Sequence, residues 1–234
     1  MSEKLFAEKE LREMEKRTVD RLIESIESGD KEGAKKIAQR MYKEFESMHD
    51  LYRDWAASTL SAVGRNHGDE ALEKVLYEGV KAWWGPNVKK IGGSDSSTLA
   101  KRIKMFVGGL HGHLQPLNIV EDEEKVVIQM KPCGSGGRLV LERKYEGPDA
   151  LLQIEGPQTL TYGRDSLPVY CTHEPPMEQI DMDINGNPFV VIEPAAELGK
   201  QHCSFIIYKN PEDIPERYYE RVGRKKPTAL ENKN

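Results

Sequence analysis

The stretch LNIVEDEEKVVIQM, residues 117–130, is where the sequence changes from helical to β-type patterning. Two runs rich in β-branched residues, 117–120 and 125–130, flank an acidic turn at 121–124. β-branched side chains pack well on a pleated surface, and a short polar turn between two such runs is typical of a β-hairpin. The sequence therefore predicts that an antiparallel sheet begins at this hairpin.

Upstream of the hairpin, apolar side chains recur at the three- and four-residue spacing of amphipathic helices. The pattern predicts helices at residues 5–27, 31–65, 70–84 and 97–110. The segments SGD at 28–30 and NHGD at 66–69 each combine a helix stop with an N-cap. Gly85-Pro86 is expected to end the third helix.

Downstream of the hairpin, alternation and apolar runs predict strands at 177–184, 189–192 and 203–208, followed by a helix at 211–222. The tripeptide NGN at 185–187 is a strong turn signal. The predicted fold is therefore α+β, with N-terminal helices packed on an antiparallel sheet and a C-terminal helix. The expected organisation is an N-terminal helical arm at 1–30, a single α+β domain at 31–223 and a polar tail at 224–234.

Charge and hydropathy exclude several classes of partner. The chain has 234 residues and a formal net charge of -5, and no basic stripe with interleaved aromatic residues indicates nucleic-acid binding. No stretch approaches the roughly 20 apolar residues that cross a bilayer, and residues 1–10 lack the apolar core of a signal peptide. We therefore expect a cytoplasmic protein without a membrane partner, and a homo-oligomer is compatible with the sequence.

The chain has three cysteines, which are expected to be reduced thiols in the cytosol. Cys133 precedes the loop GSGGR at 134–138, where glycines let the backbone approach a ligand closely. Arg138 could hold a substrate carboxylate by a two-pronged contact. Gly136, Gly137 and Arg138 are therefore candidate substrate-binding residues, and the alternative is a flexible loop with a buried thiol.

The second and third cysteines stand next to histidines. Cys171 and His173 form an i, i+2 pair, and the prolines at 175–176 are expected to keep the chain after them out of a helix. Alternation along the last strand places Cys203 and His202 on opposite faces, so they are not expected to reach one ion. The alternatives are an exposed His173 in a loop and a Cys203 that is simply a core thiol.

Histidines outside the cysteine segments are further candidates. His49 and Asp50 lie on a polar face of the second helix, which could close over the sheet and supply a base or a ligand. The alternative is a solvated face with a surface ion pair. His111 and His113 could chelate a metal, although a helix C-terminus is also a common place for ordinary histidines.

If the cysteines converge in the fold, two chemistries are open. Cys133, Cys171, His173 and Cys203 could bind zinc, either as a closed structural site or with water at an open position. Alternatively, Cys133 or Cys171 could be a nucleophile, with His49 or His173 as its base. The sequence has no closely spaced CxxC or HExxH motif that would decide between them.

Four segments carry a family resemblance: PCGSGGRL at 132–139, LPVYCTH at 167–173, GKQHCSFII at 199–207 and IPERYYER at 214–221. They resemble the bacterial L-2-amino-thiazoline-4-carboxylic acid hydrolases. The region around Cys203 and Phe205 also resembles 4-vinyl reductase-like small-molecule-binding domains. The resemblance covers roughly residues 119–221 and implies helices packed on a twisted antiparallel sheet, a small-molecule substrate and functional roles for the three cysteines.

The resulting functional hypothesis is a hydrolase that opens a C–N or C–S bond of a small heterocyclic or amide substrate at a cysteine and histidine pocket, with zinc as an open question. The alternative is a non-catalytic sensor or carrier domain that binds a small molecule or a metal. A third hypothesis is a structural partner in a larger complex, with the charged first helix as a docking arm.

Overall fold

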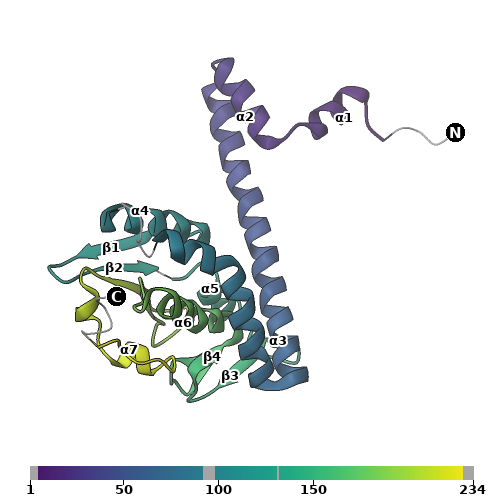
Figure 1. Cartoon of the computed structure of the whole chain (residues 1–234). Coiled ribbons are helices and arrows are strands. Elements are labelled where there is room, and N and C mark those ends of the chain that lie inside the picture. The colour runs from purple at the N-terminus through teal and green to yellow at the C-terminus, as the bar shows by residue number, and fades with distance from the viewer. Residues whose placement is uncertain (1–4, 92–97, 131, 229–234) are drawn as a thin grey trace. The chain divides into compact units, whose positions relative to one another are not determined.

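The computed structural model describes residues 5–91, 98–130 and 132–228 (Figure 1). The chain divides into two compact units, Met1–Tyr52 and Arg53–Asn234, which we call the N-terminal and C-terminal units. The division falls inside one long helix, whereas the sequence pattern suggested a boundary at residue 30. The reason is that the helix continues without a stop signal through this region.

The N-terminal unit contains α1 (Glu8–Glu15), α2 (Thr18–Glu27) and the first part of α3 (Lys31–Ile91). The prediction of one helix over 5–27 is wrong, because Lys16 and Arg17 adopt extended backbone angles. The Arg17 guanidinium instead binds both oxygens of Asp20 in the first turn of α2, at 2.7 Å each. The predicted cap of the next helix is confirmed, since Asp30 accepts a hydrogen bond from the Gly33 amide at 2.9 Å.

In the C-terminal unit, α3 breaks and turns back at Gly68, whose φ of 81° is outside the helical region (Figure 1). The predicted break there is confirmed. The predicted end at Gly85-Pro86 is wrong, because α3 continues through Pro86 to Ile91. Trp84 and Val88 are buried on either side of the proline, so packing offsets the lost hydrogen bond. The next helix, α4 (Leu99–Leu110), is capped by Thr98 and agrees with the prediction.

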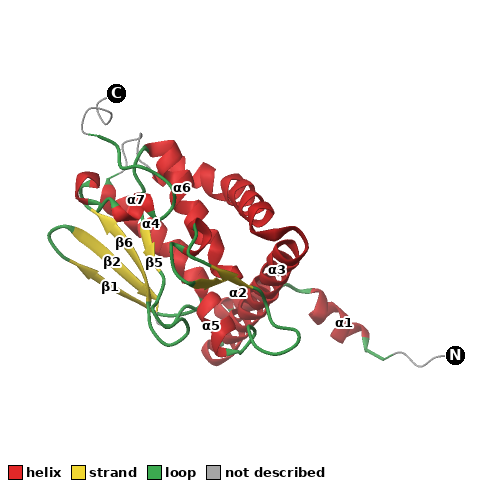
Figure 2. Ribbon diagram, turned by 90° about the horizontal axis from the view of Figure 1, so that it is seen from below, coloured by secondary structure: helices red, strands yellow, loops and turns green. Residues whose placement is uncertain are grey.

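The main sheet is antiparallel and has the strand order β1-β2-β6-β5. Its strands are β1 (Leu117–Glu121), β2 (Lys125–Met130), β5 (Val191–Glu193) and β6 (Cys203–Tyr208). The predicted hairpin is confirmed, with Leu117 opposite Met130. A small second sheet pairs β3 (Gln153–Glu155) with β4 (Ser166–Pro168). Helices α4 and α6 lie on one side of the main sheet (Figure 2).

The segment predicted as a strand at 177–184 is instead helix α6 (Glu174–Asn185). Every residue from Glu174 to Met182 is buried, so the helix has no solvent-facing side. The sequence therefore lacks the three- and four-residue spacing of apolar residues by which an amphipathic helix is recognised, and the prediction failed. Pro175 and Pro176 lie in the first turn, where a missing amide costs nothing, so they begin the helix rather than prevent it. Gly186, with a φ of 76°, ends the helix instead of joining two strands.

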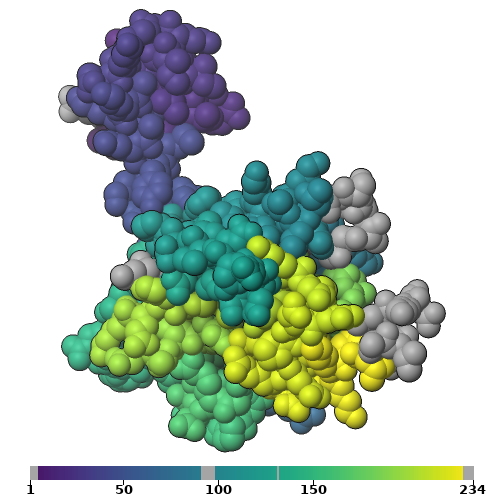
Figure 3. Space-filling view, turned by 90° about the vertical axis from the view of Figure 1, so that its left-hand side faces the viewer, coloured from purple at the N-terminus to yellow at the C-terminus, as the bar shows by residue number. Residues whose placement is uncertain are grey.

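Two further short helices complete the unit. The expected loop at 134–137 passes directly into α5 (Gly136–Leu141). The expected closing helix is reduced to a 3₁₀ turn at Pro211–Asp213 and α7 (Arg217–Glu220). Figure 3 shows the yellow C-terminal residues packed against teal and green segments from earlier in the chain. The polar tail predicted at 224–234 lies partly outside the described residues.

The main core lies between the sheet and the helices of the C-terminal unit. Phe106 of α4 packs on Phe205 of β6 with ring centroids 5.7 Å apart, and on Phe189 at 6.0 Å. A smaller cluster joins Leu72 and Leu76 of α3 to β3 and to the segment that holds Val169. The fold is thus α+β, with helices on an antiparallel sheet and a C-terminal helix, as predicted. None of the helices in the described residues is long and apolar enough to cross a membrane.

A buried ion pair ties α6 to its neighbours. Glu178 accepts hydrogen bonds at one oxygen from Arg221 at 2.6 Å, from the Ile192 amide at 2.6 Å and from the Tyr162 hydroxyl at 3.1 Å. The Arg221 guanidinium also stacks on the rings of Tyr162 and Tyr218, at 4.2 and 4.6 Å. Burial raises the pKa of Glu178 even though Arg221 opposes the change.

We expect Arg221→Met to lower the free energy of unfolding by about 3–5 kcal/mol at neutral pH, because it leaves the Glu178 carboxylate buried without its cation. Urea unfolding measures the change. Arg217→Met, on the exposed side of α7, is the matched control and should cost about 1 kcal/mol or less. Adding Glu178→Gln to Arg221→Met should recover part of the loss. Equal losses for the two arginine variants would contradict this account.

Candidate functional site

The three cysteines converge in the interior of the C-terminal unit. Cys133 follows β2, Cys171 lies in the 3₁₀ turn Val169–His173, and Cys203 begins β6. Strand pairing brings Cys203 opposite Met130, three residues before Cys133. All three thiols are buried. Negative charge on Cys133 or on Cys203 would raise the pKa of Cys171. The three thiol groups are therefore close enough to interact electrostatically.

Cysteine and backbone atoms lie so close to the glycines after Cys133 that a larger side chain would not fit there. A Cβ on Gly136 would lie 2.6 Å from the Cys171 Sγ, and one on Gly137 would lie 3.3 Å from the Cys133 Cβ. The expected close approach to the glycine backbone is therefore real, and what approaches Gly136 is a sulfur atom of the chain itself. The proposed contact of Gly136 and Gly137 with a substrate stays a prediction.

Burial holds two of the thiols in the neutral form. Desolvation, together with the charge of Glu174, raises the pKa of Cys171 well above its ordinary value and that of Cys203 to about 12. Because the thiolate is the nucleophile, neither side chain is poised to attack a substrate near neutral pH. The Cys133 Sγ accepts a hydrogen bond from the Ser135 amide at 3.4 Å, and the Cys203 Sγ accepts one from the Ala195 amide at 3.5 Å.

Glu174 is the acid that faces the thiol cluster. It is the first residue of α6 and is buried. Burial, and then the charges of Cys133 and Glu178, raise its pKa to about 8, while Arg221 and Arg164 act in the opposite direction. Its Oε2 atom is buried without a hydrogen-bond partner in the part of the chain that the structure describes. Such a carboxyl group can take up and release a proton near neutral pH.

A polar network lies beside the thiols. The His113 Nδ1 and the Ser135 Oγ are 2.9 Å apart, and Ser135 also hydrogen-bonds to the Tyr170 side chain. Burial lowers the pKa of His113, so its ring is expected to be neutral at pH 7. Burial raises the pKa of Tyr170 to about 12, with smaller effects from the charges of Cys133 and Cys171. Tyr170 thus connects the network to the thiol cluster.

An apolar pocket of about 570 Å³ ends at this network. Its walls come from α3 on both sides of the Gly68 turn and include Trp55, Leu76, Val80 and Trp83. Its polar end is formed by three side chains, His113, Tyr170 and His173. No charged side chain lines the described part of the pocket. The pocket therefore suits an uncharged or largely apolar small molecule with one polar group.

His173 lines the apolar pocket, and its predicted place in a zinc site with the thiols stays a prediction. Its Nδ1 atom lies 2.5 Å from the Tyr170 carbonyl oxygen, and its ring meets the Tyr170 ring edge to face at 5.4 Å. It faces the apolar pocket, together with His113. His111, the other half of the expected HxH pair, lines a different groove beside α4. The backbone turn after α4 separates the two rings.

Arg138 lies on α5 and pairs with Glu142, which also accepts two hydrogen bonds from the buried Arg53. The predicted contact of Arg138 with a substrate carboxylate stays a prediction, and an existing carboxylate would compete with it. His49 and Asp50 belong to the N-terminal unit, where the His49 Nδ1 and the Asp50 Oδ1 lie 3.0 Å apart. Their predicted role at the thiol cluster therefore stays untested.

The donor set of the cluster suits zinc, because thiolates and carboxylates are zinc ligands. However, among residues 5–91, 98–130 and 132–228, no three His, Cys, Asp or Glu side chains stand together in positions that could hold a metal ion. The arrangement of these side chains does not fit a bound zinc ion as it stands. The predicted zinc site with Cys133, Cys171, His173 and Cys203 therefore remains a prediction.

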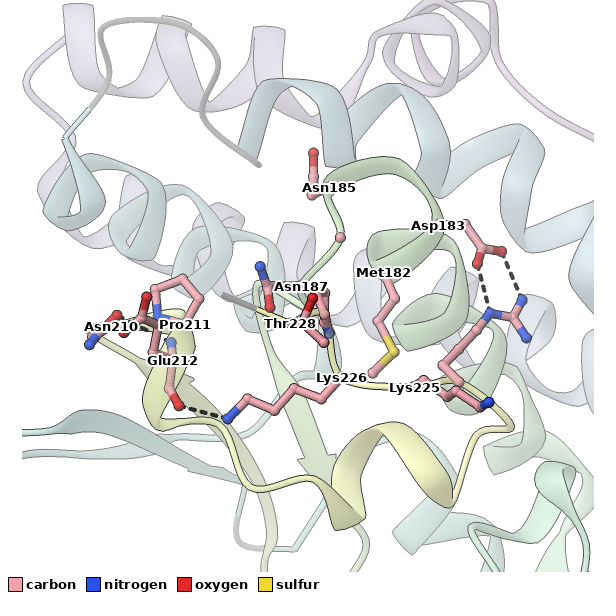
Figure 4. A pocket seen from close by; sticks show the side chains of 13 residues that line it. Met182, Asp183, Asn185, Asn187, Asn210, Pro211, Glu212, Lys225, Lys226 and Thr228 are labelled. Atoms are coloured by element: carbon pink, nitrogen blue, oxygen red, sulfur yellow. Dashed lines mark hydrogen bonds and ion pairs between the residues drawn. The ribbon is translucent and has the colours of Figure 1, made fainter. Parts of the chain in front are cut away.

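A larger groove of about 980 Å³ lies at the end of α6, away from the thiols (Figure 4). Two of the cationic side chains that line the groove already bind other groups of the same protein. Arg224 binds both oxygens of Asp183, at 2.7 and 2.8 Å, and the Lys226 ammonium donates to the carbonyl oxygens of Glu212 and Ile214. With no thiol or histidine in its lining, the groove offers less for catalysis than the cysteine cluster.

Comparison with known proteins adds no relative: neither a family model, nor a curated protein, nor a solved structure matches the chain.

Sequence reasoning missed Glu174, Ser135 and Tyr170 as participants. Glu174 was hidden because the segment around it was expected to be a loop, where a carboxylate would be solvated. Its position directly before two prolines is the signal that could have revealed a helix start. Ser135 and Tyr170 carry no such signal, because only the tertiary fold brings them to His113.

We expect Gly136→Ala to lower the free energy of unfolding by about 1–3 kcal/mol, because the new methyl group would overlap the Cys171 sulfur. The same substitution should cost less in a Cys171→Ala background, which a double-mutant cycle by urea unfolding measures. Gly108→Ala on α4 is the control, because its Cβ would meet no atom within 4 Å. An unchanged cost in the Cys171→Ala background would place the sulfur elsewhere.

Proposed function

We propose that this protein is a hydrolase that opens a C–N or C–S bond of a small heterocyclic or amide substrate at the cluster of Cys133, Cys171, Cys203 and Glu174. The observation that carries the proposal is the buried Glu174 carboxyl group, whose pKa is raised to about 8 by burial and then by the charge of Cys133. Paired groups of this kind activate a nucleophile and protonate a leaving group near neutral pH. The resemblance of residues 119–221 to thiazoline-carboxylate hydrolases points to the same class of reaction.

Cys133 is the nucleophile in this proposal, and Glu174 is its acid and base. The sulfur adds to the carbon of the scissile bond while its proton passes to the Glu174 carboxylate. The bond to nitrogen or sulfur then breaks as Glu174 returns the proton to the leaving atom. The enzyme-bound product is a thioester when the substrate is an amide and a thioimidate when a thiazoline loses its ring sulfur. Water finally adds to it, which releases the acid or the amide and restores the Cys133 thiol. Cys171 and Cys203, held neutral by burial, form the wall of the site.

The apolar pocket that ends at His113, Tyr170 and His173 provides the approach for the substrate. Its lining favours a ring or chain without net charge, with a hydrogen-bonding group directed towards His113 and Tyr170. An assay panel should therefore include neutral lactams and thiazolines together with 2-aminothiazoline-4-carboxylate. Ring opening is followed by mass spectrometry, as the gain of one water, and by the release of a free thiol or amine.

The non-catalytic sensor or carrier remains the second candidate function, because three buried thiols beside an apolar pocket also suit tight binding. Stoichiometric uptake of a small molecule without turnover across the panel would favour it over the hydrolase. Turnover that is lost in Cys133→Ala and retained in an exposed-site control, Glu197→Gln, would favour the hydrolase.

We expect kcat/KM to fall below about pH 8, because Glu174 is then protonated and cannot accept the Cys133 proton in the first step. Glu174→Gln should lower kcat about 10²–10⁴-fold and remove this fall. Stability should change in the same window. Because the pKa of Glu174 is raised in the folded state, its contribution is present at low pH and is lost as the pH rises towards 8. A pH profile that is unchanged in Glu174→Gln would exclude the role.

Elemental analysis of the purified protein tests the metal version of the site. If zinc is present near one ion per chain, it should be lost in both Cys133→Ala and Cys171→Ala and retained in Glu197→Gln. Full activity after treatment with a chelator would exclude a catalytic zinc ion. An active Cys133→Ser variant would exclude the cysteine nucleophile instead.

A further inference from the structure

The N-terminal unit has large apolar side chains but no core of its own. The buried apolar side chains of the described residues all lie between Ala57 and Val222, in the C-terminal unit. The buried residue in the described part of the N-terminal unit is the polar Ser25. A helical hairpin without a hydrophobic core is only marginally stable in water, since helices draw most of their stability from packing an apolar face. This unit therefore needs a surface to pack on.

The exposed side chains of this unit follow the spacing of helix pairing. On α3 they fall at intervals of four, three and four residues: Met41, Phe45, Met48 and Tyr52. On α2 they fall at intervals of four and three: Val19, Ile23 and Ile26. All seven are between 38% and 62% exposed. An alternating spacing of three and four keeps one seam of a helix towards a partner helix.

The two helices are held together as one hairpin. The Thr18 hydroxyl at the start of α2 donates to the Glu44 carboxylate of α3 at 2.6 Å. The turn between them is fixed by the Ser25 hydroxyl, which donates to the Asp30 carbonyl oxygen at 3.0 Å. Both apolar stripes therefore belong to one helical hairpin.

The charges of the hairpin allow a second copy to approach. None of the seven stripe residues is charged, and neighbouring charges on α3 are paired along the same helix. Arg40 binds Glu44 at 3.0 Å, and Lys43 binds Glu46 at 2.6 Å. Two such stripes can therefore meet without burying an unpaired charge, which would be costly.

We propose that the α2–α3 hairpin is a homodimerisation element, in which the apolar stripes of two copies pack together as a four-helix bundle. Large apolar side chains offer on the order of 100–250 Å² each, with the aromatic ones at the upper end, so the exposed parts of the seven amount to at most roughly 600 Å² per copy. Two copies then bury at most about 1,200 Å², which reaches the range of about 1,200–2,000 Å² for specific, stable interfaces. The proposal does not depend on the hydrolase activity.

The test is the mass of the full-length chain by size-exclusion chromatography with light scattering. The expected mass is twice the 26.6 kDa of one chain. Phe45→Glu/Met48→Glu places two charges in the seam and should yield a monomer. Lys36→Glu, which changes the net charge by the same two units at an exposed position outside the two stripes, is the matched control and should remain dimeric.

Circular dichroism and urea unfolding distinguish a lost interface from a lost fold. The monomeric variant should keep the unfolding transition of the C-terminal unit, since that core lies beyond residue 52. A wild-type chain that is monomeric from nanomolar to high micromolar concentration would overturn the proposal and leave a different protein as the occupant of the stripes. A dimer that persists in Phe45→Glu/Met48→Glu would also overturn it.

Discussion

The Glu178 carboxylate joins four parts of the C-terminal unit at a single buried oxygen. It binds Arg221 after α7, the Ile192 amide of β5 and the Tyr162 hydroxyl. The fourth part is α6, the helix to which Glu178 itself belongs. In a dry interior such a network is strong when complete and costly when any member is missing. Its geometry fixes the rotation of α6 about its axis. Glu174 lies one turn earlier on the same face, so the same contacts direct it towards the thiols.

The chemistry of the site follows from this burial. Desolvation raises the pKa values of Cys171, Cys203 and Glu174, so their neutral forms predominate over a wide range of pH. Backbone amides donate to the sulfur atoms of both Cys133 and Cys203, at 3.4 and 3.5 Å.

The two units use apolar residues in opposite ways. The C-terminal unit buries its own, around Phe106 and Phe205, and is complete as a folded body. The N-terminal unit displays its apolar residues along α2 and α3, which is costly for an isolated hairpin. The proposed dimer offsets this cost, and it would join two copies of the C-terminal unit to one bundle. The long α3 helix, shared by both units, links the assembly to the site covalently.

The sequence by itself determined the elements whose signals are local. The hairpin of residues 117–130, the strand at Cys203, the cap at Asp30 and the break at Gly68 all follow from short-range patterning, because turn, cap and alternation depend on neighbouring residues. It also indicated that Cys133, Cys171 and Cys203 belong together. Tertiary structure alone decided that α6 is a helix, that Pro86 is tolerated and that Glu174 faces the thiols. Each of these depends on burial by residues distant in the chain, which can override local preference and shift the pKa of a carboxyl group.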